Sequence, residues 1–342
     1  MKLIHCADLH LNRPFTGMDS PVKAAAARAE QMDLLGRIAA MARKADVLLI
    51  AGDLFDNSYF DLAQLQQMRE QFKGIPHVFI APGNHDPYTP RSPYALFDFG
   101  EQVHVFRGET ETVDCGSFTV TGNAGRPVGR VSLPPGKPHL LCVHGEVGGG
   151  EYNPLSPKEL APFTYCALGH VHSCSDFTEN WAYSGVPLGG GFDELGQKGV
   201  IAGKMEGETR SLSFVPLPGR QYRSVTVELS RAGSYEEVEH AVFSACPEPG
   251  RDAWRIVLSG TVHPAFPFRE AVLQERIGEK FYYLKIHTRL RPDLSYEDLA
   301  DQYTLRGLFV KEMLEQGSSQ KVRRAMELGV ELLEGRKPGD AL

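Results

Sequence analysis

The chain has 342 residues, of which 42% are hydrophobic and 23% are charged, and its formal net charge is −7. This composition is that of a globular chain of about two domains, and it excludes an intrinsically disordered protein. The acidic balance argues against a generally basic surface that would bind nucleic acid by charge alone.

The sequence has no sign of a membrane or secreted protein. No apolar run reaches the roughly 18 residues needed to span a bilayer, and the N-terminal MKLIHCADLH is a poor signal peptide because it holds an acidic residue and two histidines. The six cysteines lack CxxC spacing and lie mostly in apolar runs, so we interpret them as reduced, buried thiols. We therefore expect a cytoplasmic protein without membrane contact.

Short apolar strands alternate with helical or loop segments from the N-terminus to about residue 216. Residues 22–44 have the period of an amphipathic helix, and 61–73 also have a helical pattern. We expect strands at 2–7, 47–52, 77–82, 103–106, 139–145 and 165–170, and hairpins at 111–122 and 199–218. Strand–helix–strand units followed by hairpins predict an α/β (α+β) fold, a mixed sheet sandwich with helices outside.

The pattern resets at Pro216-Leu217-Pro218-Gly219, where we place a domain boundary. Strands and helices then alternate over about 70 residues, as in a small α+β domain. A helical tail follows, interrupted at 317–319. The predicted domains are 1–218, 221–290 and 294–342. The apolar residues expected on one face of the tail are Leu299, Tyr303, Leu308, Phe309 and Met313.

Polar residues able to bind metals follow the apolar strands at their carboxyl ends. They are Asp8 with His10, Asp53, Asn84 with His85 and Asp86, His144, and His170 with His172. Ligand sites in α/β sheets favour these strand ends, and glycine beside a ligand lets the backbone approach an ion closely. Residues at i and i+2 of an extended strand point to the same side, so each Asp-x-His or His-x-His pair is expected to aim two ligands at one place.

Seven of these residues form a candidate ligand set: Asp8, His10, Asp53, Asn84, His144, His170 and His172. Seven mixed nitrogen and oxygen ligands are too many for one tetrahedral ion. They suit two ions that share a carboxylate, about 3.5–4 Å apart, the arrangement used on phosphate esters. A zinc site of Cys166 and Cys174 with the neighbouring histidines is an alternative, but it leaves the Asp and Asn residues unexplained. Other histidines, such as His5 inside a strand, are interpreted as structural.

The strings DLH, GDLFD, GNHD, HG and GHVH, in that order over residues 1–172, resemble the calcineurin-like metallophosphoesterase superfamily. The string YSGVPLGGGFDELGQKG at 183–199 is similar to SbcD-type DNA repair nucleases, relatives of the MRN-complex nuclease subunit, and within them to YhaO-type exonuclease-like proteins. The resemblance extends to about residue 290 and covers the tail weakly. It implies a four-layer metallophosphoesterase β-sandwich flanked by helices, with a small α+β capping domain.

The resemblance also implies a role for each ligand. A first ion would be held by Asp8, His10 and His172, which we name the first-ion group. A second ion would be held by Asn84, His144 and His170, the second-ion group, with Asp53 bridging the two ions. The ions implied are two Mn²⁺, although Fe, Zn or Co suit the same ligands.

By the same resemblance, His85 would not be a ligand. It would stabilise charge beside the scissile phosphate and pass a proton to the leaving oxygen, while a hydroxide bridging the two ions would be the nucleophile. Asp86 is expected to support the loop or the ligands rather than bind an ion. Asp56 has two interpretations, a support of the same kind or the N-cap of a following helix.

Three arginines near the motifs are candidate contacts to substrate phosphates: Arg13, Arg91 and Arg126. Asn12 stands where the family often has glycine, so the first loop is expected to differ in shape.

Three functions compete. The favoured one is a DNA repair nuclease, an exo- or endonuclease acting on DNA ends. Its implied partners are DNA, an SMC-like ATPase of SbcC type, and a second copy of the chain that docks through the helices after Asp19 or the region near Pro93–Phe99. The alternative is a metallophosphodiesterase acting on a nucleotide or other small phosphoester. The third is a scaffold with a vestigial site, which the complete ligand set argues against.

Overall fold

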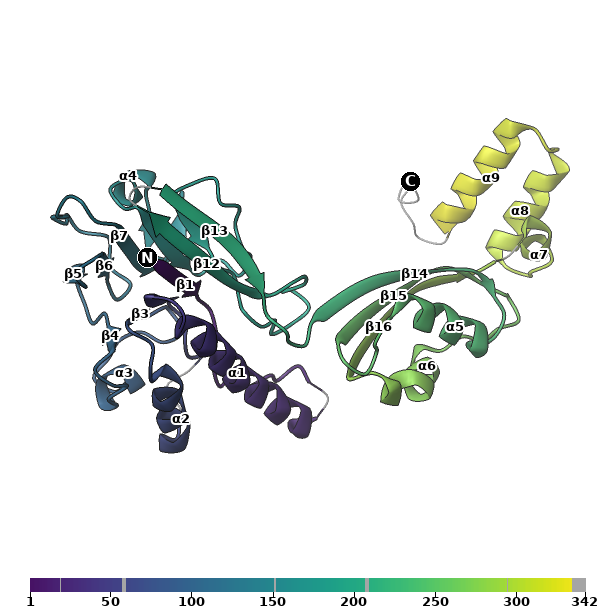
Figure 1. The fold of residues 1–342 in the computed structure, drawn as a ribbon. Helices are drawn as coiled ribbons and strands as arrows, with labels where there is room; N and C mark the ends of the chain where they lie inside the picture. The colour runs from purple at the N-terminus through teal and green to yellow at the C-terminus, as the bar shows by residue number, and fades with distance from the viewer. Residues whose placement is uncertain (19, 57–59, 151, 207–208, 294, 334–342) are drawn as a thin grey trace. The chain divides into compact units, whose positions relative to one another are not determined.

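The computed structural model describes residues 1–342 except 19, 57–59, 151, 207–208, 294 and 334–342, and it divides into two compact units (Figure 1). The first unit contains Met1–Arg223 and Arg251–Ala253, and the second contains Ser224–Gly250 and Trp254–Leu342. The end of the predicted tail, 334–342, lies outside the described residues. The division into catalytic domain, capping domain and tail stays a prediction.

The first unit contains a six-stranded sheet with the strand order β13-β12-β1-β2-β3-β4. Its strands are β1 (Lys2–Cys6), β2 (Val47–Ala51), β3 (Val78–Ala81), β4 (Val103–Val105), β12 (Gly199–Glu206) and β13 (Thr209–Pro216). Strands β1 to β4 pair in parallel, whereas β12 is antiparallel to both β1 and β13. The predicted hairpin at 199–218 is therefore confirmed, and the carboxyl ends of β1, β2 and β3 lie at one edge of the sheet.

A five-stranded sheet has the order β11-β10-β7-β6-β5. Its strands are β5 (Glu111–Asp114), β6 (Thr119–Gly122), β7 (His139–His144), β10 (Tyr165–Gly169) and β11 (Trp181–Tyr183). β5 and β6 are antiparallel, which confirms the hairpin expected at 111–122. The other neighbouring strands of this sheet pair in parallel. Two short strands, β8 (Glu146–Val147) and β9 (Pro154–Leu155), pair with each other in parallel.

The two sheets pack face to face and enclose a largely apolar core. Val47 and Leu49 of β2 lie in this core together with Leu140 of β7, and all three are inaccessible to solvent. The intervening residues Leu48 and Ile50 belong to a second core on the outer face of the six-stranded sheet, because side chains alternate along a strand. β2 is thus buried on both faces, as its unbroken apolar run predicts.

Helices α1 (Pro21–Ala42) and α2 (Leu62–Phe72) cover that outer face (Figure 1). Ile38 of α1 and Met68 of α2 are fully buried against the sheet. The outer face of the five-stranded sheet packs on α4 (Pro157–Leu160) through Leu160 and on the flanking loops. The result is a four-layer arrangement of helices, sheet, sheet, and helix with loops, as expected from the sequence.

The second unit holds a three-stranded sheet of order β14-β15-β16 with two helices packed on it. The elements are β14 (Tyr222–Ala232), α5 (Tyr235–Ala245), β15 (Ala253–Val262), α6 (Glu270–Ile277), a 3₁₀ turn (Gly278–Lys280) and β16 (Tyr283–Pro292). Val238 and Val242 of α5 and Leu273 of α6 are fully buried against Ile256 of β15. This is the small α+β pattern that the sequence predicts after residue 220.

The tail continues the second unit with α7 (Tyr296–Ala300), α8 (Leu305–Glu315) and α9 (Gln320–Leu333). Leu299, Phe309 and Met313 lie in one small apolar cluster, as expected. Tyr303 and Leu308 do not, since they are 99% and 54% exposed. The predicted common face was wrong for these two residues: Tyr303 lies in the turn between α7 and α8, and Leu308 lies on the solvent side of α8.

Short elements escaped the sequence analysis. These are α3 (Pro93–Leu96), α4, β8, β9 and β11, each of two to four residues, and a periodic pattern needs a longer segment to be visible. No helix in the part of the chain that the structure describes is long and apolar enough to cross a bilayer.

His5, in β1, is fully buried between the two sheets. Its Nε2 donates to the carbonyl oxygen of Leu168 at 3.1 Å, so its Nδ1 accepts from the hydroxyl of Tyr165 at 2.8 Å. Burial lowers the pKa of His5 to about 3, and the bond to Leu168 opposes this only partly. His5 is therefore a neutral structural histidine that ties the six-stranded sheet to β10.

Replacing His5 with Gln should flatten the dependence of stability on pH. The unfolded chain binds a proton at this residue near pH 6.5, whereas the folded protein does so only near pH 3, so the free energy of unfolding falls as pH drops below 6.5. Between about pH 6 and 4, the wild type should lose up to about 1.4 kcal/mol more per pH unit than His5→Gln. Urea unfolding at several pH values measures this, with the partly exposed His77→Gln as control. Equal slopes in wild type and His5→Gln would contradict the assignment.

Candidate metal centre

The carboxyl ends of strands from both sheets meet at one edge of the sandwich. The loops after β1 and β2 are joined by hydrogen bonds from the Asp8 amide to Gly52 O (3.0 Å) and from the His10 amide to Asp53 O (2.9 Å). The loop after β10 joins them, because the His170 amide donates to both carboxylate oxygens of Asp8 at 3.1 and 3.2 Å. The structure thus brings together all seven predicted ligands: Asp8, His10, Asp53, Asn84, His144, His170 and His172.

The paired ligands converge for a reason that the sequence pattern did not contain. Strands β1 and β10 end before the Asp-x-His and His-x-His pairs, which lie in loops, so the argument from an extended strand was wrong. Left-handed backbone occurs at Asp8 (φ 53°), His10 (45°), Asp53 (47°) and His170 (101°). Such conformations are costly for residues other than glycine and recur at functional sites. Asn12, in the position where the family often has glycine, also has a left-handed φ of 67°.

Two glycines leave room for the ligands beside them. A Cβ on Gly52, whose φ is 93°, would lie 2.1 Å from His144 Nδ1. A Cβ on Gly83 would lie 2.1 Å from Asp53 Oδ1. Both distances are far below van der Waals contact, so any larger residue at either position must displace a predicted ligand.

Asp53 occupies the centre of the site and is only 2% exposed. Its Oδ2 lies 3.8 Å from His10 Nε2 and 3.4 Å from His144 Nε2, and its Oδ1 accepts from the His85 amide at 2.9 Å. Burial acts to raise the pKa of Asp53, but the hydrogen bond with His144 and the charges of His144 and His10 outweigh burial and lower it. Asp53 is therefore ionised, and it lies beside one histidine of each ion group.

His144 directs its Nε2 toward two oxygen atoms. Its Nδ1 donates to the carbonyl oxygen of Ala51 at 2.9 Å, while Nε2 lies 2.9 Å from Asn84 Oδ1 and 3.4 Å from Asp53 Oδ2. A ring nitrogen that faces two acceptors requires a proton or a metal ion between them. Burial acts to lower the pKa of His144. The hydrogen bond with Asp53 and the charge of Asp8 act in the opposite direction and outweigh burial, so the pKa is raised to about 9. In the second-ion group, His170 Nδ1 also lies 3.3 Å from Asn84 Oδ1.

The first-ion group gathers on the other side of Asp53. His10 Nε2 lies 3.4 Å from His172 Nε2, and His172 Nε2 lies 4.0 Å from Asp8 Oδ1. The opposite ring nitrogens face carboxylates: His10 Nδ1 lies 3.1 Å from Asp56 Oδ1, and His172 Nδ1 lies 2.8 Å from Glu194 Oε1. Both Nε2 atoms are therefore available to one shared ion beside Asp8.

Asp56 belongs to the site and not to α2. The N-cap of α2 is Asp61, so the helix-cap interpretation of Asp56 was wrong. The contact with His10 and, to a smaller extent, the charge of His85 lower the pKa of Asp56. Its Oδ1 lies 3.7 Å from the Nδ1 of His85, whose side chain is 47% exposed. Asp56 is thus an ionised group that contacts one predicted ligand and the predicted proton donor.

Asp86 supports the loops around the site. Its carboxylate accepts from the Gly83 amide (2.6 Å), the Phe55 amide (3.0 Å) and the Tyr94 hydroxyl (2.5 Å). Burial, with a contribution from the charge of Asp53, raises the pKa of Asp86 to about 7. These contacts connect the loops after β2 and β3 to α3.

The donors fit divalent ions. Three groups have donor atoms within 4.8 Å of one another: Asp8 with His10 and His172, Asp8 with Asp53 and His144, and His10 with Asp53 and His85. Carboxylate, amide and imidazole donors suit Mn, Fe or Zn. His85 takes part in one group, and its role as a proton donor instead of a ligand stays a prediction. Cysteine is absent from these groups, which cover the described residues, and Cys166 is buried in β10.

The three predicted arginines are not equivalent. Arg13 Nη1 lies 3.4 Å from Glu194 Oε1, beside the first-ion group. Arg91 and Arg126 are exposed, and their backbone amides bond to Thr89 and Asn123. Within the described part of the chain, neither makes a hydrogen bond or ion pair with a predicted ligand. The structure therefore brings only Arg13 to the predicted ligands.

The sequence analysis missed Glu194 and Tyr152. Glu194 is 5% exposed and bonds to His172. The Tyr152 ring lies 5.5 Å from the His144 ring and 5.6 Å from the His170 ring. The glycine-rich string at 183–199 contains Glu194, but only its burial distinguishes it from the exposed Asp193 next to it.

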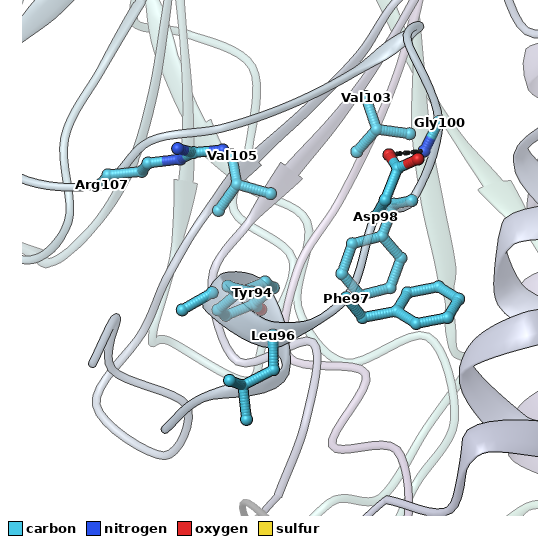
Figure 2. Close-up of a pocket in the computed structure, with 10 residues that line it drawn as sticks. Tyr94, Leu96, Phe97, Asp98, Gly100, Val103, Val105 and Arg107 are labelled. Carbon is cyan, nitrogen blue, oxygen red and sulfur yellow. Dashed lines mark hydrogen bonds between the residues drawn. The ribbon is translucent and has the colours of Figure 1, made fainter. Parts of the chain in front are cut away.

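A separate cavity of about 340 Å³ lies beside α3 (Figure 2). It is lined by Tyr94 and Leu96 of α3, by Val103 and Val105 of β4, and by the segment between these elements. The hydroxyl of Tyr94 bonds to Asp86, so the cavity adjoins a support of the metal centre without containing a predicted ligand.

Comparisons with known proteins identify a family that the chain resembles. Residues 1–174, half of the chain, match the family model described as Calcineurin-like phosphoesterase, and this range contains all seven predicted ligands and His85. The chain is also 26% identical over 204 residues to the Uncharacterized metallophosphoesterase YhaO of Bacillus subtilis (strain 168), covering 50% of this chain and 48% of that protein. The chain therefore spans about half the length of the curated relative it matches.

Replacing Gly83 with Ala should remove bound metal without unfolding the protein. The new Cβ would lie 2.1 Å from Asp53 Oδ1, so that carboxylate must move away from its two histidines. The affinity for metal should fall by roughly 10–100-fold, so less metal should remain after dialysis. Elemental analysis measures the metal, and circular dichroism measures the fold. Gly108→Ala is the control because a Cβ there meets nothing within 4 Å. A Gly83→Ala variant with full metal content would contradict the geometry.

Proposed function

Because the chain belongs to the calcineurin-like phosphoesterase family of metal-dependent hydrolases, we propose that it cleaves phosphodiesters with two divalent ions and acts as a DNA repair nuclease on DNA ends. The observation that carries the two-ion reaction is the buried carboxylate of Asp53. It lies 3.8 Å from His10 of the first-ion group and 3.4 Å from His144 of the second. A carboxylate between two ligand sets is the arrangement that two-metal phosphoesterases use.

Different residues of the chain would have different roles in this reaction. When bound, two divalent ions polarise a phosphate group and activate water at neutral pH. The buried carboxylates of Asp8 and Asp53 supply negative charge to hold both ions, whereas Asn84 contributes a neutral oxygen that does not cancel further positive charge. His144 is held by Ala51 with its Nε2 toward the site, which fixes the atom available for binding.

His85 is the proposed proton donor. Its ring is 47% exposed at the edge of the site, where a substrate can reach it, and its backbone amide is held by Asp53. Asp56 lies 3.7 Å from Nδ1 and stabilises positive charge on the ring, which leaves Nε2 as the atom that gives a proton to the leaving oxygen.

DNA is proposed as the substrate from the string at 183–199 that resembles SbcD-type nucleases and from the α+β part of the second unit, which would be the cap that the resemblance implies. Arg13, with a side chain 29% exposed beside the first-ion group, is the best-placed phosphate contact. Since the net charge is −7, DNA would be held by such local contacts and not by overall charge.

Metal identity and partners are further parts of the proposal. Mn²⁺ is proposed from the resemblance and the mixed donor set. An SMC-like ATPase is proposed to dock on the tail, where Leu305, Leu308 and Leu332 are exposed, and self-association through the region near Pro93–Phe99, where Leu96 is 72% exposed. We propose that the protein works in the cytoplasm.

The proposed function is tested on end-labelled linear duplex DNA with Mn²⁺, with Mg²⁺ and with chelator, alongside a chromogenic phosphodiester and a phosphomonoester. Metal-dependent shortening of the DNA, absent in an Asp53→Asn preparation purified in parallel, is the expected result. Hydrolysis of the small diester with intact DNA would instead favour the alternative, a phosphodiesterase for nucleotides or other small phosphoesters. Absence of activity on all three substrates would reject both the nuclease and the small-phosphodiesterase function.

Replacing His85 with Gln should slow catalysis and leave the metal in place. Glutamine is close in size but cannot transfer a proton, so kcat should fall by about 10²–10⁴-fold. Elemental analysis of the same preparation should give the same metal content as wild type. His77→Gln, a histidine outside the site, serves as the control. Metal loss in parallel with activity would show that His85 is a ligand, contrary to the assignment.

A further inference from the structure

Glu194 makes a set of contacts that the two-ion reaction does not by itself explain. It lies in the loop after β11, in a glycine-rich string, yet it is only 5% exposed. A carboxylate buried this deeply is costly unless donors surround it. Its Oε1 faces His172 Nδ1 at 2.8 Å and Arg13 Nη1 at 3.4 Å, and its Oε2 accepts from the Gly190 amide at 2.5 Å.

These three donors come from three different loops. Arg13 follows β1, His172 follows β10 and Gly190 follows β11. A Cβ on Gly190 would lie 2.0 Å from Arg13 Nη1, so a larger residue there must displace the end of the Arg13 side chain. The guanidinium of Arg13 and the Gly190 amide, together with the His172 ring, form a set of donors that suits a carboxylate anion.

The contact with Glu194 decides which nitrogen of His172 faces the site. A carboxylate only accepts, so the Nδ1 of His172 must carry the proton, and Nε2 is left with its lone pair. That Nε2 lies 3.4 Å from His10 Nε2 and 4.0 Å from Asp8 Oδ1, where the first ion would sit. An anionic partner also makes the imidazole a stronger ligand.

The two ion groups are supported unequally. In the first-ion group both histidines face carboxylates through Nδ1, His10 through Asp56 and His172 through Glu194. In the second-ion group His144 donates from Nδ1 to the neutral carbonyl of Ala51. The first-ion group therefore has two carboxylates behind its histidines. Glu194 lies within hydrogen-bond distance of the His172 ring and orients it, whereas Asp56 acts on His10 through its charge.

We propose that Glu194 is a positioning residue that fixes His172 toward the first ion and makes the first-ion group the tighter of two unequal metal sites. The inference rests on the proposed function, because it assumes that both groups bind an ion. It adds an order of metal binding: the first-ion group binds its ion before the second-ion group does.

The test is a calorimetric titration of metal-free protein with Mn²⁺. The wild type should show two binding events of unequal affinity, and His172→Ala should abolish the tighter one while His144→Ala abolishes the weaker. Glu194→Gln should weaken the tighter event by roughly 10–100-fold and leave the weaker event unchanged. Glu194→Asp, which keeps the carboxylate, should recover part of the loss. The matched control is Asp193→Asn, the same loss of charge at the exposed neighbour, which should behave as wild type.

A double-variant cycle separates positioning from general stability. In a His172→Ala background, Glu194→Gln should have no further effect on metal affinity, because the residue it acts through is gone. Unchanged affinities in Glu194→Gln, or equal weakening of both events, would overturn the proposal. The wild type could instead bind a single ion. If that binding is weakened in Glu194→Gln and lost in His172→Ala, the two-ion function is rejected and the positioning role of Glu194 is kept.

Discussion

The candidate centre depends on keeping the ionised carboxylate of Asp53 buried at the edge where the two sheets meet. An isolated charge in such a place costs several kcal/mol, and removing its partners would leave that cost uncompensated. Asp53 follows β2 of one sheet, and His144 is the last residue of β7 of the other. The contact between them therefore forms only when the two sheets pack at the observed register, so the geometry of the candidate centre depends on how the sheets pack.

The loops around Asp53 bear the strain that this arrangement needs. Left-handed backbone at Asp8, His10, Asp53 and His170 costs on the order of 1–3 kcal/mol at each residue. Packing in the two cores and bonds between loops, such as that from the His170 amide to Asp8, offset this cost. At Gly52 and Gly83, any side chain would have to displace a predicted ligand. Asp56 and Glu194 contact predicted ligands from behind, and Asp86 holds the loops that carry others.

Buried polar residues in this unit serve two different purposes. His5 is neutral and fully bonded to Tyr165 and Leu168, so it contributes to the contact between sheets and has no capacity left for a ligand. His144, equally buried, has one nitrogen directed at two oxygens and is incomplete without a cation. Burial and residue type are the same in both cases. The difference lies in whether the hydrogen-bonding capacity of the ring is already used inside the protein.

The sequence by itself determined strands β1 to β4, β7 and β10, the two hairpins, the α+β pattern after residue 220 and the residues that meet at the strand ends. Apolar periodicity and polar residues after apolar runs are local signals. It could not reveal why the ligand pairs converge, since backbone conformation in the loops differs from that of the strands before them. It also could not assign Asp56 to His10, exclude it as a helix cap, or distinguish Glu194 from Asp193. Those contacts join residues from separate loops, and only tertiary packing decides which carboxylate is buried beside a histidine and which remains in water.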